Sequence, residues 1–383
     1  MSGLIGNLLS AAKSLTAQQA GVEVAGRNLA NINNPAYARQ RVQLGDRIIT
    51  DTALGPIGSG VEVLGIKHIR DQFLDIAVAR EGAQTGLLQA QQSGLQRAEA
   101  ALGEHVDRSG DSGSISAATS ATTGIGAGLN DFFNAFDELA ASPMDAGAKQ
   151  VLLQKADTLA NKFNVTDQRL SSLQDDLSEE VRIGADKVNS LLTQVADLNG
   201  EIHKFELQRP ESALDLRDQR QARLEELSKY IDFSTRQIPG GHGQIQILAK
   251  DAGGADVLLL DKTSVTGVSF DGTQISGGAP STPLALQGGA LKGQLLVRDG
   301  AIQQLRDDIK RTADQLASGV NAAYGATGAN FFQVRLINII VLDMLQNAFK
   351  NADLRSRIVY RLLSLSLPSS HQTADNCINR NRR

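Results

Sequence analysis

The chain has 383 residues and a formal net charge of −4, which argues against a nucleic-acid-binding protein because such proteins need a basic face for phosphates. Aromatic residues make up only 4% and Trp is absent, so the composition favours long helices over a large globular enzyme core. The single cysteine, Cys377, excludes a disulfide scaffold and a multi-cysteine metal site. We expect no membrane insertion and no cleaved signal peptide, because no run approaches about 18 apolar residues and the first residues lack the pattern of a secretory signal.

The first segment, residues 1–35, carries apolar residues at a spacing of seven on two rows. This spacing predicts one amphipathic helix over residues 3–31 that packs against another helix, and the stretch Asn31–Pro35 should end it. An ordinary helical hairpin core could carry the same rows, so the spacing alone leaves the partner open. The candidate interface consists of Leu4, Leu8, Leu15, Val22, Leu29 and Ile32.

The second segment, residues 36–232, is predicted to be an extended loop followed by a long helical rod. Alternating apolar runs near its start predict short strand-like pieces, and apolar residues at helical spacing follow them. We expect helices over about 71–102, 128–141, 146–207 and 212–230.

The longest of these helices carries a row of apolar or small residues at a spacing of seven, which is typical of a coiled-coil seam. Within this row, Gly184 either weakens the seam or lets a neighbouring segment approach closely. The row consists of Ala156, Phe163, Leu170, Leu177, Gly184, Leu191, Leu198 and Phe205.

The remaining residues predict a small antiparallel β domain over 233–290 and a returning helix in 291–332. Residues 333–383 hold eight Lys or Arg and three Asp, so this segment carries about +5 against about −9 for the rest, and we expect a poorly ordered basic tail. The predicted fold class is therefore mainly α, elongated, with long coiled-coil-like helices and one inserted small β domain.

The motifs that could carry chemistry are weak. Residues 215–220 alternate Asp and Arg, and we interpret them as a solvated helix face with local ion pairs rather than as paired catalytic carboxylates. Residues 124–128 are rich in Gly but lack the Lys and Ser or Thr of a phosphate-binding loop, so a hinge is the better interpretation. The five histidines show no metal-binding spacing, so we predict no catalytic, cofactor-binding or metal site.

A motif at the end of the first helix and just after it consists of Ala30, Asn31, Asn34, Pro35, Tyr37, Arg39 and Gln40. It resembles the N-terminal motif of the flagellar axial proteins, the family of rod, hook and hook-associated subunits. Asn34 and Ala36 stand where the family has Thr and Gly. Further similar segments favour the hook-associated members at the hook–filament junction; they are residues 60–63, 69–74, 129–143, 214–220 and 289–321. The resemblance covers residues 1–332, and we expect an aberrant or truncated C-terminus after Phe332.

This resemblance implies a structural subunit of the bacterial flagellum and not an enzyme. The first helix would be weakly ordered when free and would fold as its apolar face docks into a tubular polymer. The implied partners are the flagellar hook protein, the next hook–filament junction protein, copies of the chain itself in a ring, and an export chaperone. The chaperone is expected to bind the C-terminal segment, which departs from the family here. The implied location is extracellular, after export without a cleaved signal peptide. The alternative is a coiled-coil scaffold or adaptor unrelated to flagella, and an enzyme hidden in the β domain is a third reading.

Overall fold

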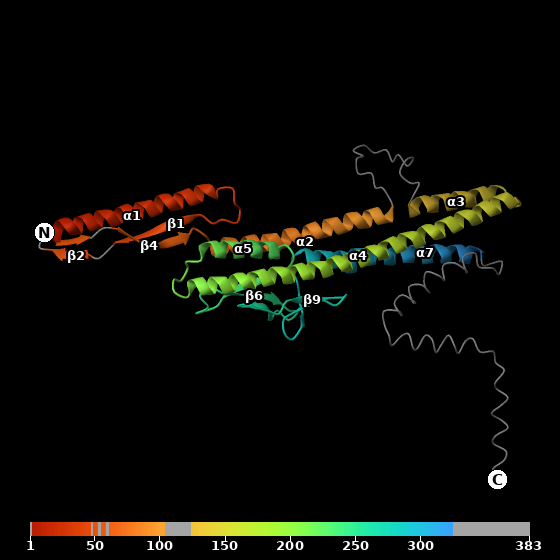
Figure 1. Cartoon of the computed structure of the whole chain (residues 1–383). Helices are drawn as coiled ribbons and strands as arrows, with labels where there is room; N and C mark the ends of the chain where they lie inside the picture. The colour runs from red at the N-terminus through yellow and green to blue at the C-terminus, as the bar shows by residue number, and fades with distance from the viewer. Residues whose placement is uncertain (1, 47–48, 53–54, 59–60, 104–123, 325–383) are drawn as a thin grey trace, which may run out of the picture. The chain divides into compact units, whose positions relative to one another are not determined.

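The computed structural model describes residues 2–46, 49–52, 55–58, 61–103 and 124–324 (Figure 1). The basic tail expected at 333–383 lies outside the described residues. Two compact units divide the chain: Met1–Leu102 with Arg169–Leu305, and Gly103–Gln168 with Arg306–Arg383. Helix α4 (Ala146–Glu206) contributes residues to both units.

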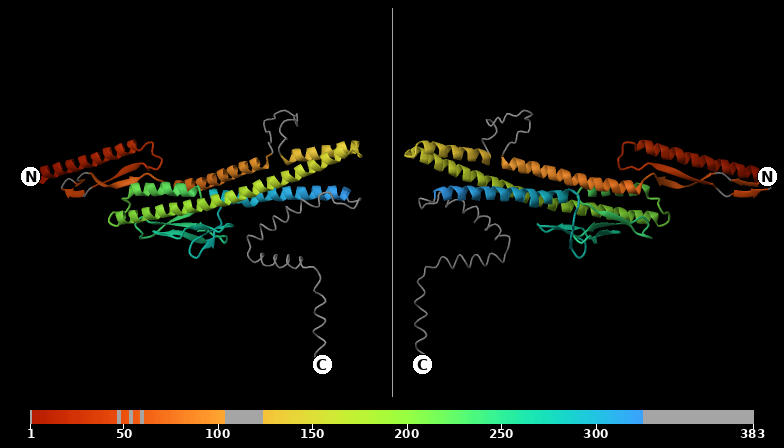
Figure 2. Two further views of the ribbon diagram at one scale, coloured as in Figure 1. Left: turned by 45° about the vertical axis from the view of Figure 1, so that its right-hand side comes forward. Right: turned by 180° about the vertical axis from the view of Figure 1, so that it is seen from behind.

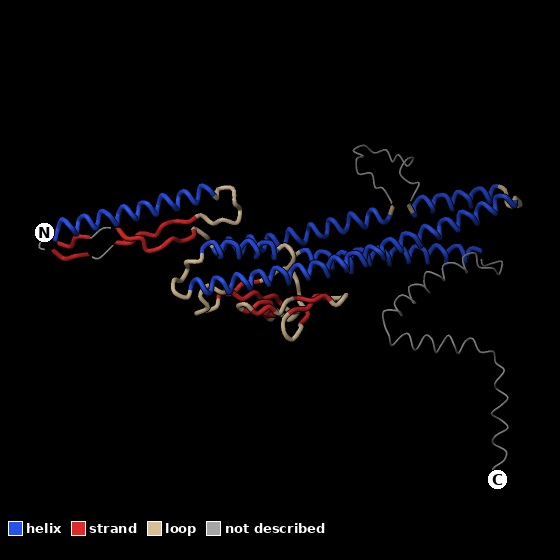
Figure 3. Tube along the Cα trace, in the orientation of Figure 1, coloured by secondary structure: helices blue, strands red, loops and turns tan. Residues whose placement is uncertain are grey.

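The fold is mainly helical, with small antiparallel sheets, as the sequence predicts (Figure 3). The helix expected over 3–31 is α1 (Ser2–Ala30), and it contacts the antiparallel strands β1 (Gln40–Asp46) and β4 (Val61–His68). A second small pair joins β2 (Ile49–Thr52) to β3 (Gly55–Gly58). Helix α1 thus packs on strands β1 and β4 of the same chain.

The first unit holds the larger hydrophobic core. Helices α2 (Gln72–Leu102), α5 (Leu214–Ser228) and α6 (Ala290–Leu296) pack together with the second half of α4, next to two small sheets. Fully buried side chains from helices and strands share this core, including Leu192, Leu227, Ile247, Leu259 and Leu291. The four-stranded sheet has the order β5 (Ser234–Gln237), β6 (Ile245–Lys250), β7 (Asp256–Asp261) and β8 (Ser264–Val265); the three-stranded sheet has the order β11 (Thr282–Pro283), β10 (Ile275–Gly277) and β9 (Val268–Phe270).

The predicted seam along α4 is buried over most of its length but the prediction is wrong at its end. Leu170, Leu177 and Leu191 are fully buried, whereas Phe205 is 67% exposed and Glu206 is buried in its place. An α-helix has about 3.6 residues per turn, so a row at a spacing of seven rotates by about 20° per heptad away from the buried side. The burial accordingly moves to Asn199 and Glu206 near the end of the helix.

Gly184 lets a neighbouring segment approach closely, which was one of its two predicted roles. A Cβ atom at this position would collide with Leu291 of α6, whose side chain is fully buried. The absence of a side chain therefore allows α4 and α6 to pack at short distance.

The returning helix is interrupted, in contrast to the continuous helix expected there. Helix α6 passes into a π-helical segment, η1 (Val297–Ile302), before α7 (Gln303–Tyr324) begins. Arg298 in η1 is 5% exposed and donates hydrogen bonds to the carbonyl oxygens of Gly272 and Thr273 at 3.1 Å. The irregular segment thus places a buried guanidinium against the β9–β10 turn.

The second unit is a three-helix arrangement of α3 (Ile125–Ala141), the first part of α4, and α7 (Figure 2). Phe132 is fully buried and packs edge-on against Phe136, with ring centroids 4.9 Å apart. Arg306 of α7 donates to both carboxylate oxygens of Asp167 on α4, at 2.8 and 3.1 Å. The hydrophobic core of the second unit consists of Phe132, Ala135, Leu152, Ala156, Leu159, Phe163 and Ala313.

Candidate functional site: the exposed face of α1 and its polar anchor

The apolar row on α1 faces solvent in the folded chain. Ala17 and Val24, each 4% exposed, form the buried side of the helix. Ala17 lies nine residues after Leu8, which is about two and a half turns, so the apolar row is on the opposite side of α1. The exposed fractions in this row are 71% for Leu8, 62% for Leu15, 73% for Val22 and 70% for Leu29; Ile32, just after the helix, is 74% exposed.

This exposure separates the two explanations of the heptad rows. In an ordinary hairpin core the apolar row would face the partner element, but here β1 and β4 contact α1 while the row itself stays open. A row of large aliphatic side chains left open on one face of a helix is typical of an interaction surface. The side chain of Leu4 is outside the described part of the structure.

Asn28, in the last turn of α1, makes the central hydrogen bonds of this motif, and the sequence analysis did not identify it. Its side-chain oxygen accepts hydrogen bonds from the Tyr37 hydroxyl at 3.0 Å and from the Gln40 backbone N–H at 2.9 Å. Its amide nitrogen donates to the Gln40 carbonyl at 2.9 Å. These three bonds join the last turn of α1 to the start of β1.

The other motif residues shape the turn between α1 and β1. The Asn34 carboxamide oxygen accepts from the Ala36 N–H at 3.1 Å, and the Asn31 side chain donates to the Arg27 carbonyl at 3.0 Å. Such bonds from short polar side chains to nearby backbone stabilise turns. Ala30, Pro35 and Arg39 are exposed, and the Arg39 carbonyl accepts from the Ile69 N–H at 2.7 Å.

Asp218 on α5 anchors this turn to the helical part of the unit. One carboxylate oxygen accepts from the Ala38 N–H at 3.0 Å, and the other accepts from the Arg70 guanidinium at 2.9 Å. The side-chain amide of Gln40 donates to Asp215 at 3.2 Å. The interpretation of residues 215–220 as a solvated face is therefore wrong for Asp218 and Arg220, which are 4% and 7% exposed.

His68 completes the polar anchor. Its Nε2 atom lies 3.4 Å from an Asp218 carboxylate oxygen, and both side chains are largely buried. Burial lowers the pKa of His68 below its usual value, against the opposing effect of Asp218. Burial raises the pKa of Asp218, while the Ala38 N–H, His68 and Arg70 oppose that rise. Asp218 is therefore held by directed donors and not by solvent.

The sequence contained one usable signal for this anchor. The segments that include Arg70 and Asp218 both resemble the axial family, as does the turn motif that they contact. Taken together, three such segments from distant parts of the chain point to one place in the fold. The assignment of the Asp215–Arg220 stretch to solvent hid that connection.

The exposed row on α1 can make apolar contacts, and the residues of the polar anchor make hydrogen bonds and ion pairs. Within the described residues no group of three or more His, Cys, Asp or Glu could hold a metal ion. Among the helices that the structure describes, none is both long and apolar enough to cross a membrane.

Known proteins match this chain over most of its length. Flagellar hook-associated protein 1 of Bacillus subtilis is 28% identical over 282 residues, covering 71% of this chain and 52% of the relative. The Escherichia coli protein of that name is 27% identical and covers 87% of this chain and 60% of its own length. The chain thus spans about half to two thirds of the length of these curated relatives.

The Salmonella typhimurium protein of the same name is 27% identical and covers 94% of this chain and 64% of the relative. Because residues 1–332 are about 87% of the chain, that match extends beyond Phe332, further than the sequence analysis expected. Among solved structures, the flagellar hook junction protein FlgK from Burkholderia pseudomallei shares the fold with a TM-score of 0.51 at 20% identity. That match covers 65% of this chain and 43% of the other.

A family model described as the flagellar hook-associated protein FlgK helical domain matches residues 116–332, which is more than half of the chain. The family consists of flagellar hook-associated proteins and not of enzymes. On this match the chain belongs to the FlgK family of flagellar hook-associated proteins.

Proposed function

We propose that this protein is a structural subunit of the bacterial flagellum that joins the hook to the filament, and that it assembles through the exposed row on α1. The observation that carries the proposal is the row itself: Leu8, Leu15 and Val22 are each more than 60% exposed on a helix that is anchored from behind. Burial of one such side chain contributes about 1.5–3 kcal/mol, so several together can drive docking.

The proposed partners follow from the curated relatives, which are named as hook-associated proteins. They are the flagellar hook protein, the next hook–filament junction protein and further copies of the chain in a ring, with an export chaperone during secretion. The proposed location is the extracellular flagellum. A scaffold unrelated to flagella has less support, because family membership and the α1 motif point to the same structure.

We also propose that different segments of the chain have different roles in the assembly. Residues 1–35 would supply the docking helix, and 36–232 with 291–332 would supply the loop and the helical rod. Residues 233–290 would form a β insertion on that rod.

The test is binding of the fluorescently labelled chain to isolated hooks, with Leu15→Asp and Val22→Asp as separate variants. Each should weaken binding by at least roughly tenfold, because a charge replaces an apolar group that becomes buried on docking. The matched control is Thr16→Asp, which adds the same charge at an exposed neighbouring position on α1 outside the row. Circular dichroism should show the same helix content in all three variants.

Equal loss of hook binding in Thr16→Asp would show that charge on α1 is sufficient, and would contradict the assignment of the apolar row. Hook binding unchanged in Leu15→Asp and Val22→Asp would overturn the docking mechanism. A chain that binds no hooks at all would count against the hook–filament junction itself.

A further inference from the structure

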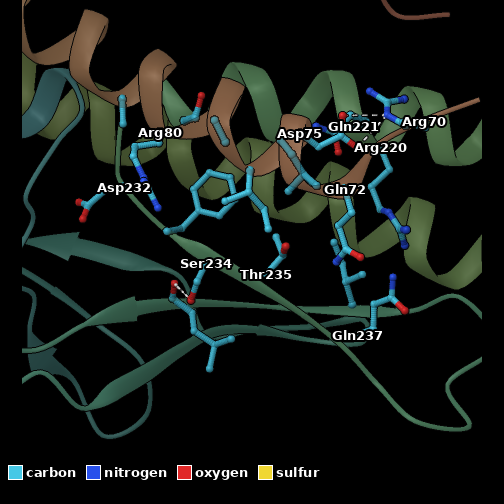
Figure 4. Close-up of a pocket in the computed structure, with 18 of the residues that line it drawn as sticks. Arg70, Gln72, Asp75, Arg80, Arg220, Gln221, Asp232, Ser234, Thr235 and Gln237 are labelled. Atoms are coloured by element: carbon cyan, nitrogen blue, oxygen red, sulfur yellow. Dashed lines mark hydrogen bonds and ion pairs between the residues drawn. The ribbon is translucent and has the colours of Figure 1, made fainter. Parts of the chain in front are cut away.

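A cavity of about 800 Å³ lies in the first unit between helices α2 and α5 on one side and strands β5 and β6 on the other (Figure 4). It is separate from the exposed face of α1, and the proposed docking does not use it. Its walls combine apolar side chains with six Lys or Arg and three Asp or Glu. Four of these cations, Lys67, Arg70, Arg217 and Lys250, form ion pairs with carboxylates, whereas Arg80 and Arg220 form none among the described residues.

Arg220 is the most informative residue of this wall. It is 7% exposed, and its Nη1 atom donates to the Asn199 side chain at 2.8 Å and to the Gly243 carbonyl at 2.7 Å. No carboxylate among the described residues forms an ion pair with it, and its Nε and Nη2 atoms make no hydrogen bond there. In the close-up its side chain extends across the cavity toward Gln237 of β5 (Figure 4).

Two buried acidic side chains of this region, Asp218 and Glu206, are already engaged with other arginines. Asp218 accepts from Arg70, and Glu206 accepts two hydrogen bonds from Arg217. Burial lowers the pKa of Arg220 to about 10, so the guanidinium still carries its charge at neutral pH. A buried charge without a counter-charge is costly, and an anion that enters the cavity would remove that cost.

Arg80 is a second guanidinium in the wall without a carboxylate partner among the described residues. It lies at the opposite end of the cavity from Arg220 in the close-up (Figure 4). Gln72 lies at the Arg220 end (Figure 4). From Gln72 to Arg80, helix α2 advances by eight residues, which is about 12 Å. Four residues of an extended strand span about 13 Å, and positions four apart lie on the same face of a strand.

Strand β5 gives the cavity an open edge. It stands at the end of the four-stranded sheet, paired with β6 on one side only within the described residues. Ser234 and Thr235 both line the cavity although consecutive side chains of a strand point to opposite faces. The cavity therefore reaches the edge of β5, where backbone groups can pair with an added strand.

We propose that this cavity binds an extended acidic peptide segment of a partner protein. The peptide adds a strand along the free edge of β5, and two carboxylates four residues apart pair with Arg220 and Arg80. Backbone pairing with β5 supplies affinity, and the two guanidinium groups select acidic side chains.

The probe is a labelled peptide of four Thr-Glu repeats, capped at both ends, titrated into the full chain and followed by fluorescence anisotropy. The same peptide with Gln in place of Glu should bind at least roughly tenfold more weakly, because charge-assisted hydrogen bonds are lost. A Thr-Glu peptide N-methylated at alternate residues should also bind more weakly, because it cannot pair with β5. Binding of the Thr-Glu peptide should weaken as salt rises.

Two variants assign the charges. Arg80→Gln and Arg220→Gln should each weaken binding of the Thr-Glu peptide by roughly tenfold or more, and each should reduce its preference over the Thr-Gln peptide. The matched control is Arg169→Gln, which removes an exposed arginine of α4 that does not line the cavity and should change nothing. Arg80 is exposed, so Arg80→Gln keeps the test valid if Arg220→Gln fails to fold.

Equal affinity for the Glu and Gln peptides would overturn the role of charge. Unchanged binding of the N-methylated peptide would overturn strand addition at β5. Free glutamate or citrate binding as tightly as the peptide would reduce the cavity to a small-anion site and overturn the proposal of a peptide. Self-association of the chain that the Thr-Glu peptide does not displace, with no peptide binding, would assign the cavity to a second copy instead.

Discussion

Glu206, the last residue of α4, is a buried carboxylate whose partners are all directed at it. Arg217 donates to its two oxygens at 2.8 and 2.7 Å, and the Ala213 N–H donates at 3.3 Å. Burial alone would raise the pKa of Glu206, but the hydrogen bonds and charge of Arg217 lower it below the usual value of 4.5. Glu206 therefore fixes the turn that leads from α4 into α5.

We expect Glu206→Gln to lower the free energy of unfolding near neutral pH by about 1–3 kcal/mol, because a charge-assisted hydrogen-bond pair is lost. A lowered folded-state pKa means that the stabilisation is present above the usual value and is lost as pH falls through the folded-state pKa. The difference between wild type and variant should therefore shrink below pH 4.5, as measured by urea unfolding at several pH values. A difference that stays constant down to strongly acidic pH would contradict this assignment.

At the same scale, buried polar residues were the hardest to predict from sequence. Asp218, His68 and Asn28 owe their roles to partners that are 9 to 180 residues away along the chain. Spacing rules describe which residues share a face of one element, and they carry no information on such distant partners. The apolar row on α1 could be predicted because its regularity lies within one helix.

At the scale of elements, close packing of helices depends on small residues at the crossing points. Gly86 on α2 faces the backbone carbonyl of Lys229, just after α5, so closely that a Cβ atom would overlap with it. The same carbonyl accepts a hydrogen bond from the Ala290 N–H at 2.8 Å, at the start of α6. Three helices thus meet at a position where only Gly fits.

Gly86→Ala should destabilise the protein by about 1–3 kcal/mol through this overlap, although Ala is the better helix former by about 1 kcal/mol. The matched control is Gly319→Ala on α7, where nothing lies within 4 Å of the added Cβ atom and a small gain in stability is expected. Thermal unfolding monitored by circular dichroism distinguishes the two. A gain in stability for both variants would show that α2 can move away from Lys229 at no cost.

The helices were predictable because long periodic segments carry strong signals, and α2, α3, α4 and α5 appear where the sequence predicts them. The failures within them are physical. The seam on α4 rotates away from the core by Phe205, because the helix does not supercoil enough to hold a spacing of seven. The π-helical segment at Val297–Ile302 escaped notice because its cause, the burial of Arg298 against a turn, is tertiary.

At the scale of the whole molecule, two units have separate hydrophobic cores. The core of the first unit combines helices and sheets, and that of the second lies among α3, α4 and α7. Because one continuous helix, α4, takes part in both, the order of segments along the chain does not show this division. Only the contacts in the folded chain reveal it.

Phe132→Ala should therefore loosen the second unit selectively, because truncation of a fully buried Phe costs about 3–5 kcal/mol. Hydrogen exchange followed by mass spectrometry should show faster exchange in α3, α7 and the first part of α4. Peptides from β6 and β7 should keep their protection, since their core is separate. Uniform loss of protection in both units would instead show that the chain unfolds as one cooperative body.

The packing of α1 on β1 and β4 has a kinetic consequence for docking. Helix α1 packs on the two strands β1 and β4, so it would meet a binding partner as a preformed helix. Little conformational entropy would then be lost on binding. In the proposed docking, association would then need no folding step, and the lifetime of the docked state would be set by the side chains of the exposed row. The hydrogen bonds of Asn28 connect the end of α1 to β1. We expect them to affect the association rate of a subunit more than its dissociation rate.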